Sequence, residues 1–202
     1  MRSHALAIGV AAAALLALGA CNKGTGGNAQ QSAQTPKAEK VAGNQTIASG
    51  LDKNSQFMAA AKAAGLDQTL AGPGPYTVFV PDDAAFNGAP KGTFSTDPKN
   101  RAQLTGVITN LILPGTVLVA DIDKAVDTGK GKAVLATMGG GTLTATKDGG
   151  KTVLTDSSGH KATITKGDEK YTNGVVHHVD GLLMPGKPAA ANAPAVGKKA
   201  GK

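Results

Sequence analysis

Two neighbouring histidines are the first side chains of this 202-residue sequence whose type could carry chemistry. His177 and His178 follow Val175 and Val176 in a run that predicts a β-strand. Imidazole rings bind metals and exchange protons near neutral pH. In a strand, however, adjacent side chains point to opposite faces, so the two rings cannot hold one ion together. We therefore predict no metal site here and a hydrogen-bonded structural role for His177.

A second cluster, Asp156-Ser157-Ser158-Gly159-His160, contains the three residue types of a serine hydrolase. Catalytic triads assemble from separate elements of a fold, and no Gly-x-Ser-x-Gly elbow surrounds either serine. The composition is instead typical of a polar β-turn. We predict a turn at this position, no catalytic residue and no cofactor.

Other charged groups also fit structural roles better than chemical ones. Asp82 and Asp83 stand before Ala84-Ala85-Phe86, which favours helix capping over acid–base catalysis. The segment Gly129-Lys130-Gly131-Lys132 lacks the upstream Gly and the Ser or Thr of a phosphate-binding loop.

Three closely spaced aspartates, Asp121, Asp123 and Asp127, suggest calcium. The segment has no Gly and no Glu at the sixth and twelfth places that an EF-hand loop requires. We expect these carboxylates on the solvated face of a helix.

The first twenty-one residues have the pattern of an export signal. A short positive region is followed by an apolar run from Ala5 to Leu18, which is too short to span a membrane as a helix. The single cysteine of the chain, Cys21, directly follows Leu18-Gly19-Ala20. This arrangement resembles the bacterial lipobox, which implies a lipoprotein signal peptide over residues 1–20 and a lipid on Cys21. Asn22 after the cysteine favours the outer membrane by the same resemblance, with the periplasmic or surface side left open.

Composition divides the remaining chain into three parts. Residues 21–45 and 187–202 lack the large apolar residues of a core, and we predict a flexible tether and a disordered Lys/Ala/Pro tail. Residues 46–186 are long enough for one domain. The whole chain has a formal net charge of +7, yet residues 46–186 contain thirteen basic and thirteen acidic side chains. The excess positive charge therefore lies in the flanking segments.

Within residues 46–186 the hydrophobic period changes from helical to alternating. Helices are predicted over 54–64 with Gly65 as their stop, over 104–111 with Pro114-Gly115 as the stop, and around 122–126. Strands are predicted over 76–80, 134–136, 142–146, 152–155, 162–165 and 175–179. This order predicts an α+β fold, a single compact domain with several helices in its N-terminal half.

Two segments resemble the signature motifs of the fasciclin domain family. The first runs from Tyr76 to Phe86 and includes Thr77, Phe79, Pro81 and Phe86 of the strand-then-cap pattern. The second runs from Asn173 to Pro185 and includes Asn173, Gly174, His177 and Asp180. The resemblance covers about 140 residues and implies an α+β domain with a β-sandwich or wedge. It implies that these eight motif residues are structural.

One departure from the family pattern bears on function. Fasciclin domains often carry Tyr-His before a mid-domain Pro-Gly, a dipeptide associated with integrin-type adhesion. Here Asn110 and Leu111 occupy those positions, which argues against an animal-style integrin role. Lys166-Gly167-Asp168 is expected to be an ordinary turn between two strands.

The sequence thus favours a non-enzymatic, lipid-anchored protein of the cell envelope. Its membrane contact is expected through Cys21, and its partner is an unknown protein or polysaccharide bound in adhesion or matrix contact. The alternative is a periplasmic binding module for a small or polymeric ligand. Nucleic acid is excluded as a partner, because an exported protein is separated from the nucleic acid of the cell and because six aromatic residues offer little base stacking. The oligomeric state is left open.

Overall fold

The computed structural model describes residues 43–186. The predictions for the signal peptide, for Cys21, for most of the tether and for the tail lie outside this range. Residues just before 46 already contact the domain: Thr172 N–H donates a hydrogen bond to the Gln45 carbonyl (2.8 Å), and Gly43 lies against the backbone of Tyr171.

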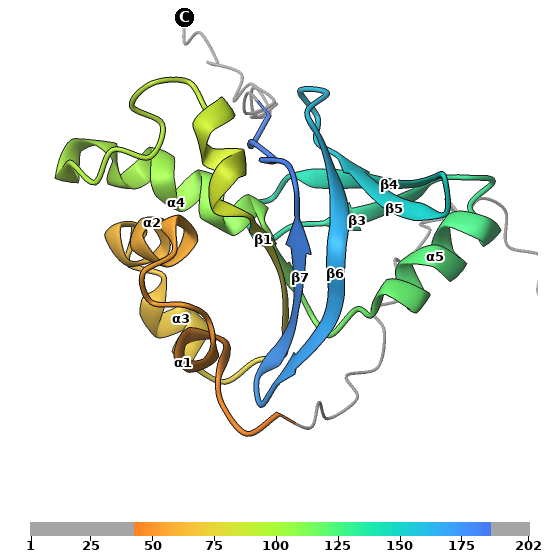
Figure 1. The fold of residues 1–202 in the computed structure, drawn as a ribbon, viewed down its shortest axis with the longest axis horizontal. Helices are drawn as coiled ribbons and strands as arrows, with labels where there is room; N and C mark the ends of the chain where they lie inside the picture. Colours follow the sequence, from red (N-terminus) through yellow and green to blue (C-terminus); the bar gives the residue numbers. More distant parts are fainter. Residues whose placement is uncertain (1–42, 187–202) are drawn as a thin grey trace, which may run out of the picture. The chain divides into compact units, whose positions relative to one another are not determined.

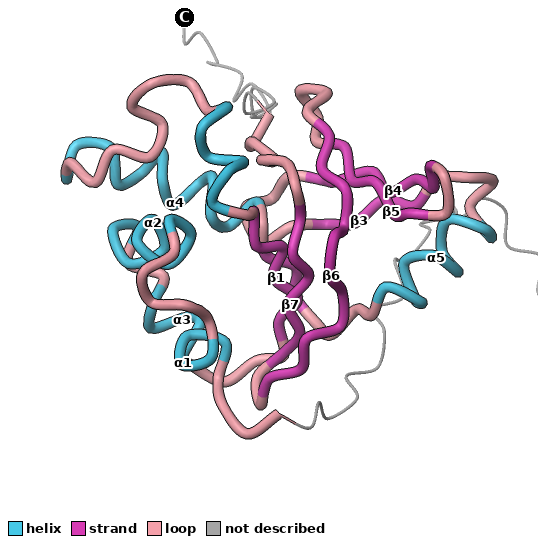
Figure 2. The backbone as a smooth tube through the Cα atoms, viewed as in Figure 1, coloured by secondary structure: helices cyan, strands magenta, loops and turns pink. Residues whose placement is uncertain are grey.

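The first half of the described chain is mostly helical (Figures 1 and 2). Its elements are α1 (Ile47–Gly50), α2 (Gln56–Ala64), α3 (Asp67–Ala71), β1 (Tyr76–Pro81), the 3-10 segments η1 (Asp83–Gly88) and η2 (Pro98–Asn100), α4 (Arg101–Asn110), β2 (Ile112–Pro114) and α5 (Val119–Thr128). Helix α2 begins where the Ser55 side chain accepts a hydrogen bond from Met58 N–H, and it ends at Gly65 in the left-handed conformation. None of the helices within residues 43–186 is long and apolar enough to cross a membrane.

The second half supplies most of a seven-stranded sheet. It contributes β3 (Ala133–Ala136), β4 (Thr142–Asp148), β5 (Lys151–Thr155), β6 (Lys161–Tyr171) and β7 (Gly174–Val179). The strand order is β2-β1-β7-β6-β5-β4-β3, and β1 and β7 are the parallel pair. The predicted strands are all present, and β6 extends beyond its predicted end to Tyr171.

Strand β6 belongs to both halves of the sheet. Its first residues pair with β5 and its later residues pair with β7, with register shifts between Ile164 and Glu169. At the far edges, Met138 N–H donates to the Ile112 carbonyl (2.7 Å), which brings the end of β3 next to β2. The sheet therefore curves almost into a barrel, and the predicted α+β fold class is confirmed.

Helices cover the two parts of this curved sheet separately. Figure 1 shows α1 to α4 beside β1 and β7, and α5 beside the part formed by β3, β4 and β5. The large side chains that are fully buried are Phe57, Phe79, Ile47, Leu70, Leu104, Ile108, Leu111, Ile112, Ile122, Leu143, Leu154 and Leu183. Because they come from helices and strands alike, one core joins the two halves.

Two local predictions about chain path were wrong, and two short helices were not predicted. The helix predicted to run to Pro114-Gly115 ends at Asn110, because the residues after it form β2 against β1. The segment Lys166-Gly167-Asp168 is not a turn but the irregular part of β6, where Asp168 has a φ of 61°. Helices α1 and α3 were not predicted, because four and five residues are too short to show a helical period.

Gly174 is needed where β7 begins, because a Cβ atom there would meet the Tyr76 carbonyl on β1. Gly174→Ala is expected to lower the free energy of unfolding by about 2–4 kcal/mol, measured by urea denaturation. Gly106→Ala in α4 is the control. Its Cβ would meet nothing within 4 Å, so it should stabilise by about 0.5–1 kcal/mol. Equal effects from the two substitutions would contradict the close-approach explanation.

Candidate functional site

The residues predicted from the two motifs lie together on β1, η1, β7 and the turn before β7. The parallel pairing sets Thr77 opposite Val175 and Phe79 opposite His177. The full set consists of Thr77, Phe79, Pro81, Phe86, Asn173, Gly174, His177 and Asp180. All of these except Asp180 are buried. The two motifs, about 100 residues apart in the chain, therefore form one structural unit.

His177 is fully buried and both of its ring nitrogens are bonded. Nδ1 accepts a hydrogen bond from Asp168 N–H (3.0 Å), and Nε2 lies 2.8 Å from the Val117 carbonyl oxygen. Because Nδ1 accepts, Nε2 carries the proton and donates it to Val117. The ring centroid lies 5.6 Å from that of Phe79 on the neighbouring strand.

The electrostatics of His177 favour the neutral ring. Burial lowers its pKa below the ordinary value, against the opposing effects of the Val117 carbonyl and the Asp168 carboxylate. A neutral imidazole with both nitrogens engaged has no free lone pair for a metal or a substrate proton. The arrangement suits a positioning role and no acid–base chemistry.

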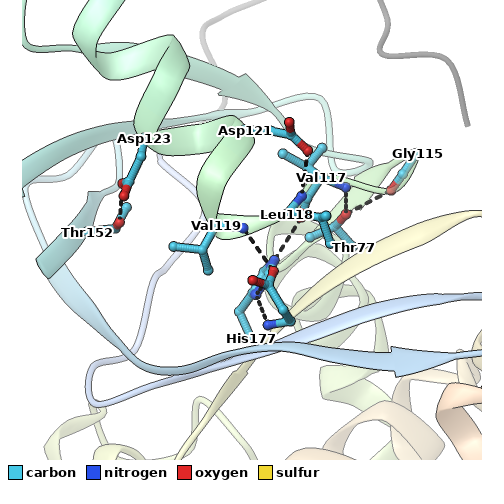
Figure 3. Close-up of polar contacts among 10 residues, drawn as sticks. Thr77, Gly115, Val117, Leu118, Val119, Asp121, Asp123, Thr152 and His177 are labelled. Carbon is cyan, nitrogen blue, oxygen red and sulfur yellow. Dashed lines mark hydrogen bonds and ion pairs between the residues drawn. The ribbon is translucent and has the colours of Figure 1, made fainter. Parts of the chain in front are cut away.

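Thr77, on the neighbouring strand β1, bonds to the same loop before α5. Its hydroxyl donates to the Gly115 carbonyl (2.8 Å) and accepts from Val117 N–H (2.8 Å). Figure 3 shows Thr77 and His177 on either side of the loop 115–119. The N–H and the C=O of Val117 are thus held by one residue from each motif.

Asp168 extends this network to helix α5. Its carboxylate accepts a hydrogen bond from Val119 N–H (2.9 Å), the first residue of α5. At the same end of the helix, Asp121 accepts from Leu118 N–H (3.1 Å), as Figure 3 shows. Two carboxylates therefore stabilise the N-terminus of α5. This role of Asp168 was not predicted, because nothing in a Lys-Gly-Asp tripeptide indicates a strand bulge facing a distant helix.

Asn173 holds the helical half against the sheet. Its side-chain oxygen accepts from Ile47 N–H (2.9 Å), and its amide nitrogen donates to the carbonyls of Leu70 and Gly72 (both 2.8 Å). One buried amide thus anchors the start of α1 and the end of α3. Buried amide groups of this kind are costly to leave unpaired.

The remaining motif residues secure the ends of strands. Asp180 accepts from Thr163 N–H (2.6 Å) and so ties the end of β7 to β6. Pro81 closes β1 in a buried position, and Phe86 in η1 packs edge-on against Phe94 with ring centroids 4.7 Å apart.

The segment that resembled a hydrolase triad forms the turn between β5 and β6. The buried Asp156 accepts from the N–H groups of Ser158 (2.8 Å), His160 (2.9 Å) and Met184 (2.8 Å). Its carboxylate also lies 2.7 Å from His160 Nδ1. Within residues 43–186, no hydrogen bond joins a serine hydroxyl to His160. The carboxylate organises a turn, as the composition predicted.

The predicted capping of η1 was wrong. Asp82 stands at the start of η1 without a side-chain capping bond, whereas Asp83 accepts from Gln56 N–H (2.9 Å) at the start of α2. The carboxylate caps a helix that is distant in sequence.

The aspartates of α5 are not all on a solvated face. Asp123 turns toward β5 and accepts from the Thr152 hydroxyl (2.7 Å), and Asp127 pairs with Lys147 (3.0 Å) on β4. Among the described residues, no group of three or more His, Cys, Asp or Glu side chains is placed to hold a metal ion.

A polar cluster that the sequence analysis missed surrounds Glu169. Its carboxylate accepts from the Tyr171 hydroxyl (2.6 Å) and from the Lys166 ammonium (3.1 Å), and lies 3.2 Å from His178 Nε2. These bonds, led by that from Tyr171, hold the pKa of Glu169 below its usual value against the effect of burial. Burial and the same carboxylate raise the pKa of Tyr171. The cluster thus holds the ionised Glu169 carboxylate in place and joins β6 to His178 on β7.

Comparison with known proteins agrees with this geometry. The Fasciclin domain family model matches residues 52–185, which includes both motifs. The chain belongs to the fasciclin domain family.

Its relatives include bacterial and animal proteins. The chain is 31% identical over 141 residues to Protein sll1483 of Synechocystis, covering 69% of this chain and 71% of the relative. It is 31% identical to the transforming growth factor-beta-induced protein ig-h3 of Sus scrofa over 66% of this chain and 18% of that protein. It is 29% identical to human periostin over 68% of this chain and 15% of periostin.

A solved structure with a similar fold is a FAS1 domain pair from the insect cell adhesion molecule Fasciclin I. The TM-score is 0.58 at 17% identity, and the match covers 70% of this chain and 51% of that chain. At this identity the likeness establishes the fold alone.

The pKa of His177 leads to a prediction about stability. Because the folded chain holds this pKa below the ordinary value of about 6.5, the unfolded chain binds a proton where the folded chain does not. The contribution of His177 to the free energy of unfolding should be complete above about pH 7. It should fall as the pH drops below about 6.5, by at most about 1.4 kcal/mol per pH unit. Urea denaturation between about pH 5 and pH 8 measures this slope.

The control is the variant His160→Ala/His178→Ala, which removes the two partly exposed histidines of the described chain. It should keep the slope. Glu169 has a lowered pKa and contributes only at more acidic pH. A slope that disappears in the control variant would contradict the assignment to His177.

Proposed function

We propose that this protein is a lipid-anchored interaction protein of the bacterial cell envelope, whose fasciclin domain presents a surface for adhesion or matrix contact. The observation that carries the proposal is the family match over residues 52–185. The same kind of domain occurs in the cell adhesion molecule Fasciclin I.

The geometry of the motifs supports a non-catalytic role. His177, Thr77 and Asn173 use their polar atoms on backbone groups of the domain itself. A site of this kind sets the shape of the domain and leaves recognition to its surface. Binding is therefore the function that fits this domain, and the candidates are exposed faces.

The anchor is proposed from Leu18-Gly19-Ala20-Cys21 in the sequence. A diacylglycerol thioether with a further amide-linked chain would provide stable membrane attachment, because each buried methylene contributes about 0.8 kcal/mol. The outer membrane is favoured by Asn22. A tether after the lipid would let the domain reach partners at a distance from the membrane surface.

Cys21→Ala tests the anchor. The wild-type chain should partition into the detergent phase of a Triton X-114 extraction of cells, and the variant should partition into the aqueous phase, because the acylated thiol is lost. Cys21→Ser is the matched control for side-chain polarity and should behave as the alanine variant does. Detergent-phase partition of both variants would refute the anchor.

The interaction role is tested with the full chain solubilised from cells. After crosslinking on intact cells, the wild-type chain should retain an envelope protein or polysaccharide, identified by mass spectrometry and by sugar analysis. A cytosolic protein of similar size and charge, expressed with the same signal and tether, is the control. If the chain retains no more than this control, the interaction role is wrong.

A further inference from the structure

One face of the sheet formed by β3 to β6 has no helix on it. Side chains alternate along each strand, and those that point toward α5 and the core, such as Leu143, Ala145 and Leu154, are fully buried. The side chains between them form the opposite face. By the strand registers these are Val134, Ala136, Thr142, Thr144, Thr146, Val153, Thr155, Lys161 and Thr163, and we add the exposed Thr165, two residues further along β6. We call these ten residues the threonine face.

The threonine face is open to solvent and built from short side chains. Each of the ten side chains is exposed or half-buried, and Val134 is 69% exposed. Val134, Thr144, Thr155 and Lys161 form one row across four strands. None of the ten is aromatic or a long apolar side chain, and a row that crosses four strands suits an extended chain better than a compact ligand.

Threonine is common on exposed strands because it favours β structure, so its presence alone would not indicate a ligand. The distribution of charge is the second observation. Residues 129–166 contain six lysines and two aspartates, although the domain as a whole is neutral. One of the two, Asp156, is buried in its turn, which leaves Asp148 as the exposed acid of this segment.

The lysines border the threonine face. Lys161 stands on it, Lys151 lies opposite Asp148 at its edge, and Lys132 directly precedes β3. All three are exposed. Lys147, in contrast, points toward α5 and pairs with Asp127. Two exposed acids adjoin the threonine face: Asp148 lies opposite Lys151, and Asp180 accepts from Thr163 N–H (2.6 Å). The three lysines are in excess of these two carboxylates.

The chain also leaves the described domain beside this part of the sheet. A Cβ atom on Gly186 would meet the side chain of Ser157, in the turn between β5 and β6. Sixteen further residues follow, with lysines at 187, 198, 199 and 202.

We propose that the threonine face and its bordering lysines bind an extended polysaccharide that carries carboxylate, phosphate or sulfate groups. This inference rests on the proposed interaction role and names the class of partner. Hydroxyl groups in rows hydrogen-bond the hydroxyls of a sugar chain, and the lysines pair with its anionic groups. A lipid bilayer fits less well, because Val134 and Met138 are the exposed large hydrophobic residues of the described domain, too few to enter it.

The test uses the full chain, solubilised in detergent, and polygalacturonate as the probe, with neutral dextran as the reference polymer. Binding by the wild-type chain should be selective for polygalacturonate and should weaken as salt is raised, because exposed charges are screened. The variant Lys132→Glu/Lys151→Glu/Lys161→Glu should bind at least about tenfold more weakly. The matched control Lys53→Glu/Lys62→Glu/Lys91→Glu, which reverses three exposed lysines of the helical half, should lose much less.

A second variant tests the hydroxyls without changing charge. Thr144→Val/Thr155→Val keeps the β-branched shape and should lower affinity while leaving the salt dependence unchanged. Equal loss in both lysine variants would show a nonspecific charge effect and overturn the proposal. Binding to vesicles with anionic lipids but not to polygalacturonate would also overturn it.

The crosslinking experiment separates this inference from the proposed function. If the lysine variant on the threonine face still retains the same envelope component as the wild type, the interaction role stands and the threonine face is not its site. If the wild type retains nothing above the control, the interaction role itself fails.

Discussion

The two backbone hydrogen bonds of Val117 are the constraint on which the junction of β1, β7 and the loop before α5 depends. The Val117 N–H bonds to the Thr77 hydroxyl and the Val117 carbonyl to His177, each at 2.8 Å. The segment is buried, so losing either partner leaves a polar group unpaired in the core, at a cost of about 1–3 kcal/mol. A threonine from β1 and a histidine from β7 can reach the same residue because these strands are parallel neighbours. The pairing of the strands and the path of the loop after β2 therefore require each other.

This constraint explains why the polar motif side chains of the domain are engaged with its own backbone. His177 is fixed as a neutral ring between a bulge in β6 and the loop before α5, and Asp168 on that bulge holds the first turn of α5. Asn173 likewise bonds backbone groups at the start of α1 and near the end of α3. The polar motif residues Thr77, Asn173, His177 and Asp180 all bond to backbone groups, which do not depend on the side chain at the partner position. Function can then vary on the exposed strands and helices without disturbing the scaffold.

The sequence predicted the features of the fold that depend on residues close together in the chain. Gly65 ends α2 and the alternating run from Tyr76 gives β1, because a left-handed glycine and a β-branched run act within a few residues. The sequence did not show that Asp83 would cap α2 or that Asp168 would face α5, since both bonds join residues far apart in the chain. For the same reason β2 was taken for the end of a helix. Ile112 and Leu113 fit either period, and only β1 beside them decides in favour of a strand.

The net charge of the chain, likewise, does not show where the charged side chains lie. The net charge of +7 suggests a basic protein, yet residues 46–186 sum to zero. The fold distributes these charges unevenly, because α5 places Asp123 and Asp127 beside Lys147 on one face of the sheet. On the other face, Lys161 and Lys151 lie among threonines, with Asp148 opposite Lys151 and Asp180 bonded to Thr163 N–H. A neutral domain can therefore distribute its charges unevenly, since the side-chain alternation of β4 and β5 decides which charges meet and which face solvent.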